Sequence, residues 1–347
     1  MVGMRTMALK GIREMAMQNV PEPIIKNSNE VKIKMCVVGV CGSDIHYYLN
    51  GRIGSQVVEY PFTVGHEGAG EVVEVGNDVS RVRVGDRVAI EPAMSCMKCD
   101  QCHAGRPHTC RNLRFLGCPG QAEGCLSEYI VMPESSCFPV PDNMSYDEAT
   151  ISEPLAIGVY SVRQALHVKD KVIGILGFGP IGMSVLLAAQ ASDADKIYTT
   201  DRIDSRAARA IDCGAVWSGN PDKEDIVGKI FKQESQGLDL VFECCGKQEA
   251  MDQAVDLVKP GGRILIVGIP EFDDWSFSAD KIRRKEITLI NIRRQNHALE
   301  ETLHLLNSQG LDVSPMVTHR FPFDRTKEAF DLVAGYKDGV MKAMIDF

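Results

Sequence analysis

The stretch VIGILGFGPIGMSVLLAAQA, residues 172–191, decides the fold of the second half of this chain. An apolar run reaches Gly177 and an apolar helical pattern begins at Ile181, so a G-x-G-x-x-G motif lies between a buried strand and a helix. In that place Gly177 permits a tight turn, Gly179 lets a pyrophosphate approach the backbone, and Gly182 lets helix and strand pack closely. The helix N-terminus supplies N–H donors. The stretch therefore predicts a dinucleotide site.

Strand and helix patterns alternate on the C-terminal side of this motif. The expected strands are 171–176, 196–200, 239–243, 263–267 and 287–292, with helices beginning at 181, at 205 and near 248. Such alternation is typical of an α/β fold with a doubly wound parallel sheet. Residues 172–192 carry no charge and are long enough to cross a bilayer, but glycines and Pro180 interrupt them. A buried strand, turn and helix fit better than a membrane span.

Asp201 follows the second strand of this pattern, 24 residues after Gly177. A carboxylate there can accept hydrogen bonds from the adenosine ribose hydroxyls and repels a 2′-phosphate, which favours NAD over NADP. Arg202 and Arg206 complicate the preference, because an arginine beside the ribose accommodates a phosphate; Arg206 can equally lie over the adenine. The alternative is a structural glycine turn with a solvated Asp201.

Length and composition set the wider frame. The 347 residues suggest two domains, and 44% hydrophobic with 24% charged residues is typical of a globular protein rather than a disordered one. A net charge of −9 makes nucleic acid an unexpected partner. The first residues lack the apolar segment and cleavage site of a signal peptide, which predicts a cytoplasmic protein. Up to about residue 150, the sequence has the pattern of short strands and turns, whereas the tail from residue 298 mixes helix and strand and is expected to close against the first domain.

Four cysteines are crowded into 15 residues of the first half, with two, two and seven residues between them: Cys96, Cys99, Cys102 and Cys110. One loop can fold four thiolates into a tetrahedron around Zn²⁺, and a closed site of this kind is structural. The alternatives are an iron–sulfur cluster, disfavoured because the closing proline of the ferredoxin motif is missing, and free buried cysteines.

A second set of possible ligands is spread along the chain as Cys41, His66, Glu67 and Glu153. No single one of them is decisive. Together they offer a thiolate, an imidazole and carboxylates, a mixed set that leaves a coordination position open for water or substrate. The sequence thus suggests a second, catalytic zinc.

These motifs resemble the zinc-containing medium-chain alcohol dehydrogenases, over essentially the whole chain. GHEGAGEVVEVGNDV at 65–79 is similar to the zinc signature of that family, and the four cysteines and the glycine motif follow in the family's order. CGSDIHY at 41–47, GDRVAIEP at 85–92 and EPL at 153–155 look most like sorbitol and xylitol dehydrogenases.

The resemblance implies a GroES-like β-barrel catalytic domain and a Rossmann domain. The catalytic domain would comprise residues 1–153, with the structural zinc lobe at about 94–112, and the returning tail 296–347. The Rossmann domain would comprise 154–295, and the cleft between the two domains would hold the reaction. The resemblance also implies a homo-oligomer, a tetramer or dimer, with the strand at 287–292 added to a neighbour's sheet.

The resemblance also assigns roles to individual residues. The catalytic zinc would be held by Cys41, His66 and Glu67, with Glu153 either ligating it or holding its bound water. Substrate hydroxyls would meet Tyr47, Glu153 and Arg294, although Gln295 stands where the animal sorbitol enzymes have an aromatic residue. The residues implied around the cofactor are Gly177, Gly179, Ile181, Gly182, Asp201, Arg206, Val267, Gly268 and Ile292.

The reaction expected from this set is oxidation of a secondary alcohol, a polyol such as sorbitol or xylitol, to a ketose, with NAD⁺ and two Zn²⁺ per chain. The proton would leave through Ser43 and the cofactor ribose towards His46, or through the zinc-bound water to Glu153. Ser43 as a turn cap and His46 as a surface residue is the alternative. Rival substrates are butanediol, simple secondary alcohols and the 3-hydroxyl of L-threonine, and a sensor or structural protein that binds NAD and zinc is the non-enzymatic alternative.

Overall fold

The computed structural model describes residues 3–347, which form two compact units. The first unit comprises the chain up to Glu153 together with Leu299–Phe347, and the second comprises Pro154–Ala298. Helix α3 (Tyr146–Gln164) contains the border between them. The tail Leu299–Phe347 is therefore part of the first unit.

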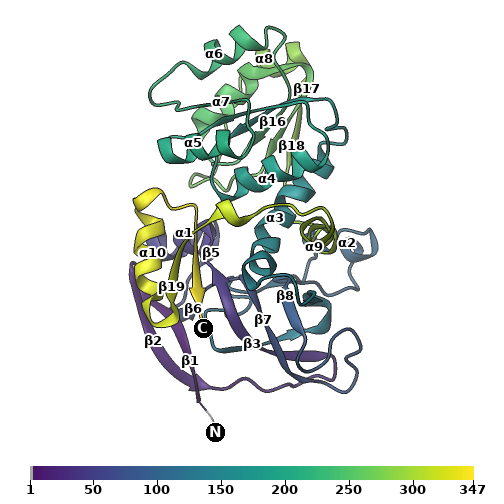
Figure 1. Ribbon diagram of the computed structural model, residues 1–347, viewed down its shortest axis with the longest axis vertical. Helices are drawn as coiled ribbons and strands as arrows, with labels where there is room; N and C mark the ends of the chain where they lie inside the picture. Colours follow the sequence, from purple (N-terminus) through teal and green to yellow (C-terminus); the bar gives the residue numbers. More distant parts are fainter. Residues whose placement is uncertain (1–2) are drawn as a thin grey trace. The chain divides into compact units, whose positions relative to one another are not determined.

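The first unit is built mainly from strands (Figure 1). They are β1 (Gly3–Gly11), β2 (Glu14–Pro21), β3 (Glu30–Gly39), β4 (Arg52–Ile53), β5 (Gln56–Val57), β6 (Phe62–Thr63), β7 (Glu67–Val75), β8 (Arg87–Ile90), β9 (Ala93–Met94), β10 (Arg114–Phe115), β11 (Tyr129–Pro133), β12 (Cys137–Pro139), β19 (Val317–Pro322) and β20 (Lys342–Asp346). Its helices, besides the first part of α3, are α1 (Gly42–Asn50), α2 (Asp100–His103), α9 (Leu299–Ser308) and α10 (Thr326–Ala334).

Strand β3 organises the larger sheet of this unit, whose order is β12-β8-β7-β3-β20-β19, with β11 also paired to β3. The apolar side chains of Val31, Ile33 and Met35 in β3 recur at every second residue and are buried, as is typical of a strand. Lys34 is exposed, whereas Lys32 is also buried and pairs with Glu22. The C-terminal strand β20 pairs antiparallel with β3, so that Ile345 lies opposite Val38. This pairing places residues more than 300 positions apart side by side.

The second unit holds a parallel sheet in the order β15-β14-β13-β16-β17-β18. Its strands are β13 (Val172–Leu176), β14 (Lys196–Thr200), β15 (Trp217–Gly219), β16 (Leu238–Glu243), β17 (Val258–Ile266) and β18 (Thr288–Asn291), and its helices are α4 (Pro180–Ala191), α5 (Asp204–Asp212), α6 (Ile226–Gln233), α7 (Gln248–Leu257) and α8 (Ala279–Lys285). Numbered within the unit, the order is 3-2-1-4-5-6, that of the Rossmann fold, and its direction reverses between β13 and β16.

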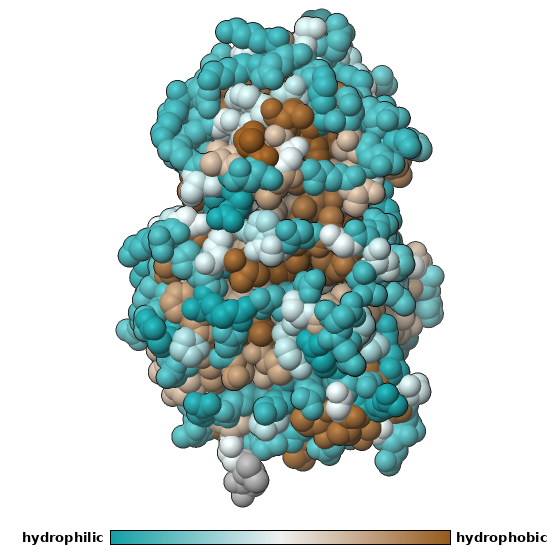
Figure 2. Space-filling model, in the orientation of Figure 1, coloured by the Kyte–Doolittle hydropathy of each residue, from teal (hydrophilic) through white to brown (hydrophobic). Residues whose placement is uncertain are grey.

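Each unit has its own apolar core. Buried side chains of β3, β7, β8 and α10 belong to the core of the first unit, and those of β16, α6, α7 and β17 to a core of the second. Hydrophilic residues make up most of the surface on the face shown in Figure 2. Among residues 3–347, no helix combines the length and the apolarity that crossing a membrane requires.

Candidate functional site

The glycine motif lies where the parallel sheet reverses its strand order, at the carboxyl end of β13. Gly177 has φ of +97°, and a Cβ there would lie 2.6 Å from that of Cys245. A Cβ at Gly182 would collide with the carbonyl oxygen of Gly177. Gly179 precedes α4 in an extended conformation, and Pro180 opens that helix. The motif thus forms the tight turn and close helix packing that a pyrophosphate site needs.

Asp201 connects this turn to the next strand. One carboxylate oxygen accepts from the Phe178 amide and the other from the Ile203 amide, both at 2.8 Å. Burial raises the pKa of Asp201, although those bonds and the charge of Arg206 oppose the shift. The buried Arg206 guanidinium lies against Gly179, 3.3 Å from where a Cβ would stand, whereas Arg202 pairs with Asp222 at the surface.

The other residues implied around the cofactor lie at the same edge of the sheet. Ile181 is in the first turn of α4, Val267 and Gly268 follow β17, and Ile292 follows β18. The amides of Val267 and Gly268 both donate to the Glu243 carbonyl at the end of β16. The turn, the carboxylate and these strand ends fit a dinucleotide such as NAD.

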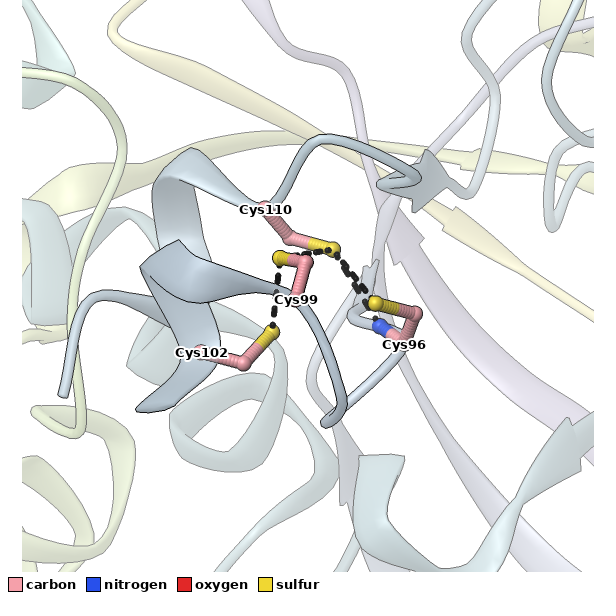
Figure 3. Close-up of side chains that lie close together, drawn as sticks. All are labelled: Cys96, Cys99, Cys102 and Cys110. Carbon is pink, nitrogen blue, oxygen red and sulfur yellow. Dashed lines mark hydrogen bonds between the residues drawn. The ribbon is translucent and has the colours of Figure 1, made fainter. Parts of the chain in front are cut away.

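The four clustered cysteines of the first unit turn their sulfur atoms towards one another (Figure 3). The sulfurs of Cys96 and Cys110 are 3.4 Å apart, those of Cys99 and Cys102 3.6 Å, and those of Cys99 and Cys110 3.8 Å. Sulfurs about 2.3 Å from one tetrahedral zinc ion would be about 3.8 Å apart. Disulfide sulfurs would be about 2.05 Å apart. The spacing therefore fits a closed Cys₄ zinc site.

Backbone N–H groups donate hydrogen bonds to two of these sulfurs, those of Cys96 and Cys110. Cys110 Sγ accepts from the amides of Cys96 and Asn112, at 3.3 and 3.4 Å. A bond from the Lys98 amide, together with bonds from neighbouring groups, lowers the pKa of Cys96 to about 6. Thiolates are the zinc ligands, so these donors favour the metal-binding form of Cys96, whereas burial and the neighbouring Cys99 and Cys110 raise the pKa of Cys102 to about 11.

Changing Cys110 to Ser is expected to remove one of two zinc ions per chain and to lower the thermal midpoint by more than about 5 °C. The lobe around the cysteines has few buried residues, so metal binding supplies much of its folding free energy. A loss of only about 2 kcal/mol already shifts a unit of this size by roughly 4–8 °C. Elemental analysis and calorimetry measure both effects.

The matched control is Cys213→Ser, the same change at the half-buried cysteine that follows α5, and this variant should keep both ions. Retention of two ions by Cys110→Ser would contradict the assignment of a Cys₄ zinc site.

The structure brings together Cys41, His66 and Glu67, whose possible ligand atoms all lie within 4.8 Å of one another. Cys41 immediately precedes α1, whereas His66 and Glu67 stand at the start of β7. His66 and Glu67 are buried, and Cys41 is half-buried. Three ligands of this mixed type fit a zinc ion that keeps one position open.

Asp44 fixes the geometry of this cluster. One oxygen lies 3.3 Å from His66 Nδ1 and 3.2 Å from the Gly65 amide, while the other accepts from the Cys41 amide at 3.3 Å. Burial opposes a charge on His66, yet Asp44 and Cys41 raise its pKa. With Nδ1 facing a carboxylate, Nε2 is left for a metal. The sequence interpretation gave Asp44 no role, although an acidic residue three positions after the helix cap was the signal for one.

Lys342 is a second residue that the sequence interpretation missed. Its Nζ lies 2.6 Å from both carboxylate oxygens of Glu67, and both side chains are 1% exposed. Burial opposes the charge of Lys342, but Glu67, Cys41 and Glu153 raise its pKa. A Cβ at Gly39 would collide with Glu67, so the glycine makes room for this pair. Glu67 therefore faces a buried cation as well as the metal position.

The remaining expected residues are divided between the two units. Ser43 Oγ donates to Cys41 Sγ at 3.3 Å, and His46 is half-buried on the same helix. Glu153 is 7% exposed and lies outside the group of three, and its charge helps to raise the pKa of Lys342. Tyr47 is buried, and its hydroxyl donates to Gln56 Oε1 at 3.3 Å. Arg294 lies in the second unit with φ of +55°.

Comparison with known proteins agrees with both parts of this site. Residues 27–142 match the family model of the alcohol dehydrogenase GroES-like domain, and residues 180–308 match that of the zinc-binding dehydrogenase. The chain is 35% identical to sorbitol dehydrogenase of Bacillus subtilis over 92% of its length and 90% of the relative's. It is also 35% identical to L-idonate 5-dehydrogenase of Vitis vinifera, over 88% and 85%.

A solved structure shows the same likeness in three dimensions. An oxidoreductase/dehydrogenase of unknown specificity from Escherichia coli superposes with a TM-score of 0.94 and 32% identity, over 99% of both chains. The first unit is thus a GroES-like catalytic domain and the second a Rossmann domain. This chain belongs to the zinc-containing medium-chain alcohol dehydrogenase family and is an oxidoreductase that depends on zinc and a nicotinamide dinucleotide.

Proposed function

We propose that the enzyme oxidises a polyol at a secondary hydroxyl, giving a ketose and reducing NAD⁺. The observation that carries this function is the three-ligand cluster of Cys41, His66 and Glu67, which leaves a position for an alcohol oxygen. The polyol is supported by the similarity to enzymes named for sorbitol and L-idonate. Polar groups of Tyr47 and Glu153 in the same unit are suited to further hydroxyls of such a substrate.

In the proposed mechanism, the chain's own residues hold the reactants and move one proton. When bound, zinc polarises the alcohol oxygen and the nicotinamide ring accepts a hydride. Ser43 Oγ, 3.3 Å from Cys41 Sγ, is the first acceptor of the alcohol proton, which then leaves in the direction of His46. His46 is three residues further along α1, hence on the same helix face, and is partly open to solvent. Glu153 is the alternative acceptor.

The substrate is tested by following absorbance of the reduced cofactor with sorbitol, xylitol, 2,3-butanediol, 2-butanol and L-threonine, each with NAD⁺ and with NADP⁺. We expect the highest kcat/KM for a polyol with NAD⁺. No activity on any polyol would overturn the proposed substrate. Highest activity on butanediol or threonine would replace it with that alternative.

Replacing Asp201 by Ser is expected to raise the KM for NAD⁺ by roughly 10- to 100-fold and to reduce the preference over NADP⁺. The carboxylate would otherwise accept from the ribose hydroxyls and repel a 2′-phosphate, and losing bonds to a charged group costs about 1.5–3 kcal/mol. Initial rates with both cofactors measure this. Asp280→Asn also removes a carboxylate, at the surface on α8, and should leave both KM values unchanged. An unaltered preference in Asp201→Ser would exclude Asp201 as the selecting residue.

We further propose a cytoplasmic homo-oligomer, a tetramer or dimer. Strand β18 supports it, because it ends the Rossmann sheet and, among the described residues, pairs only with β17. An open strand edge is a template for pairing with a second chain. None of the twelve cysteines is in a disulfide, which agrees with a reducing compartment. Light scattering of the purified enzyme gives the oligomeric mass.

A further inference from the structure

We propose that Gln56 is a specificity-determining residue that recognises a second hydroxyl of the substrate, beyond the one that is oxidised. This inference rests on the proposed polyol dehydrogenase function. It comes from the hydrogen bond between the Tyr47 hydroxyl and Gln56 Oε1, and from where that pair lies relative to the metal ligands.

Tyr47 lies on the face of α1 that holds the metal cluster. Asp44, which contacts His66, precedes Tyr47 by three residues, and residues three apart on a helix share a face. The Tyr47 hydroxyl is also 3.7 Å from Cys118 Sγ. Cys118 is three residues after Phe115, whose ring packs on His66 with 5.4 Å between centroids. Two separate segments, α1 and the chain from Phe115 to Cys118, thus contact both His66 and the Tyr47 side chain or its helix.

A short hairpin holds Gln56 against this hydroxyl. Ile53 pairs with Gln56, and Gly54 between them has φ of +53°, which a glycine adopts without strain. The Val58 amide donates to the Gly51 carbonyl at 2.8 Å and closes the base of the hairpin. Gln56 is half-buried, whereas Tyr47 and Cys118 are buried, so Gln56 is the member of this group that solvent reaches.

The chemistry of the pair suits a hydroxyl group. The Tyr47 hydroxyl donates to Gln56 Oε1, so the carbonyl side of the amide is held by the phenol. Gln56 Nε2 offers two N–H donors, and within residues 3–347 it makes no hydrogen bond. A substrate hydroxyl can accept from this amide. An alkyl chain in the same place would leave the amide unpaired, which a binding site penalises strongly.

Gln56→Leu tests the inference, because leucine is of similar size and has no polar group. We expect kcat/KM for the best polyol to fall by roughly 10- to 100-fold, mainly through KM, while that for 2-butanol stays the same or rises. Val57→Ala on the same hairpin, where the side chain is 59% exposed, is the control and should change neither. Zinc content and thermal midpoint should match the unaltered enzyme; if Gln56→Leu is unstable, Gln56→Met provides the same test.

The outcomes distinguish a failure of the role of Gln56 from a failure of the proposed polyol dehydrogenase function. An unaltered enzyme that is inactive on every polyol would refute the proposed function. A parallel fall for polyol and 2-butanol in an enzyme that does oxidise polyols would overturn the role of Gln56 alone. A selective loss for the polyol, restored in part by Gln56→Asn, would support it.

Discussion

Replacing His66 by Ala is expected to abolish alcohol oxidation, with kcat/KM falling at least roughly a thousandfold. The imidazole is buried and held by Asp44 through Nδ1, so its Nε2 is committed to the metal position. Lewis-acid stabilisation of the developing alkoxide is worth several kcal/mol, and each 1.36 kcal/mol is a factor of ten in rate. Steady-state kinetics with the best polyol and zinc content per chain measure the loss.

The surface residue His167 supplies the matched control for this change. It is exposed, so His167→Ala should leave both the rate and the zinc content unaltered. Chelation should act like His66→Ala, removing turnover while a structural zinc in the Cys₄ lobe can remain. Full activity in metal-free enzyme, or in His66→Ala, would refute the proposed catalytic zinc.

The Rossmann unit was largely predictable, because its signals are local. The strand at 196–200 was expected with the bounds that β14 has, since its β-branched and aromatic residues are followed directly by Asp201. The strand β17 was expected only from Arg263, because Lys259-Pro260-Gly261-Gly262 has the composition of a turn. The structure begins it at Val258, opposite Leu238, and accommodates the extra residues by a shift in register.

Helix α3 was missed for a related reason. Pro154 stands inside it, and proline removes a hydrogen bond from a helix interior. The buried residues Ile151, Leu155 and Val159 of this helix show why it persists, because packing of an apolar face outweighs a local preference. The sequence pattern contained the proline but not the neighbours against which the face packs.

The catalytic ligands could be proposed from motifs, but their supporting residues could not be found in the same way. Cys41, His66 and Glu67 belong to short patterns of recognisable spacing. Lys342 stands 275 residues after Glu67 in a strand with no motif, and only the pairing of β20 with β3 brings it to the carboxylate. Likewise, the role proposed for Gln56 depends on its contact with Tyr47, which exists only once the hairpin and α1 are folded together.

Replacing Lys342 by Met is expected to lower the free energy of unfolding by about 3–5 kcal/mol and turnover by more than about tenfold. Both partners of the Lys342–Glu67 pair are buried, and removing Lys342 leaves the Glu67 carboxylate in the interior without its ion-pair partner. Glu67 would also lose the cation that holds it at its present distance from Cys41 and His66. Urea unfolding and steady-state kinetics measure the two effects.

Two further variants show whether Lys342 serves stability alone. Lys196→Met breaks a surface ion pair with Glu234, so it should leave stability nearly unchanged and have no effect on turnover. In the double variant Lys342→Met/Glu67→Gln both charges of the ion pair are removed together, so neither is left without its partner and most of the lost stability should return. Turnover should not return, because the amide is a poor substitute for a carboxylate beside zinc. Recovery of stability and turnover together would mean that the pair only supports the fold.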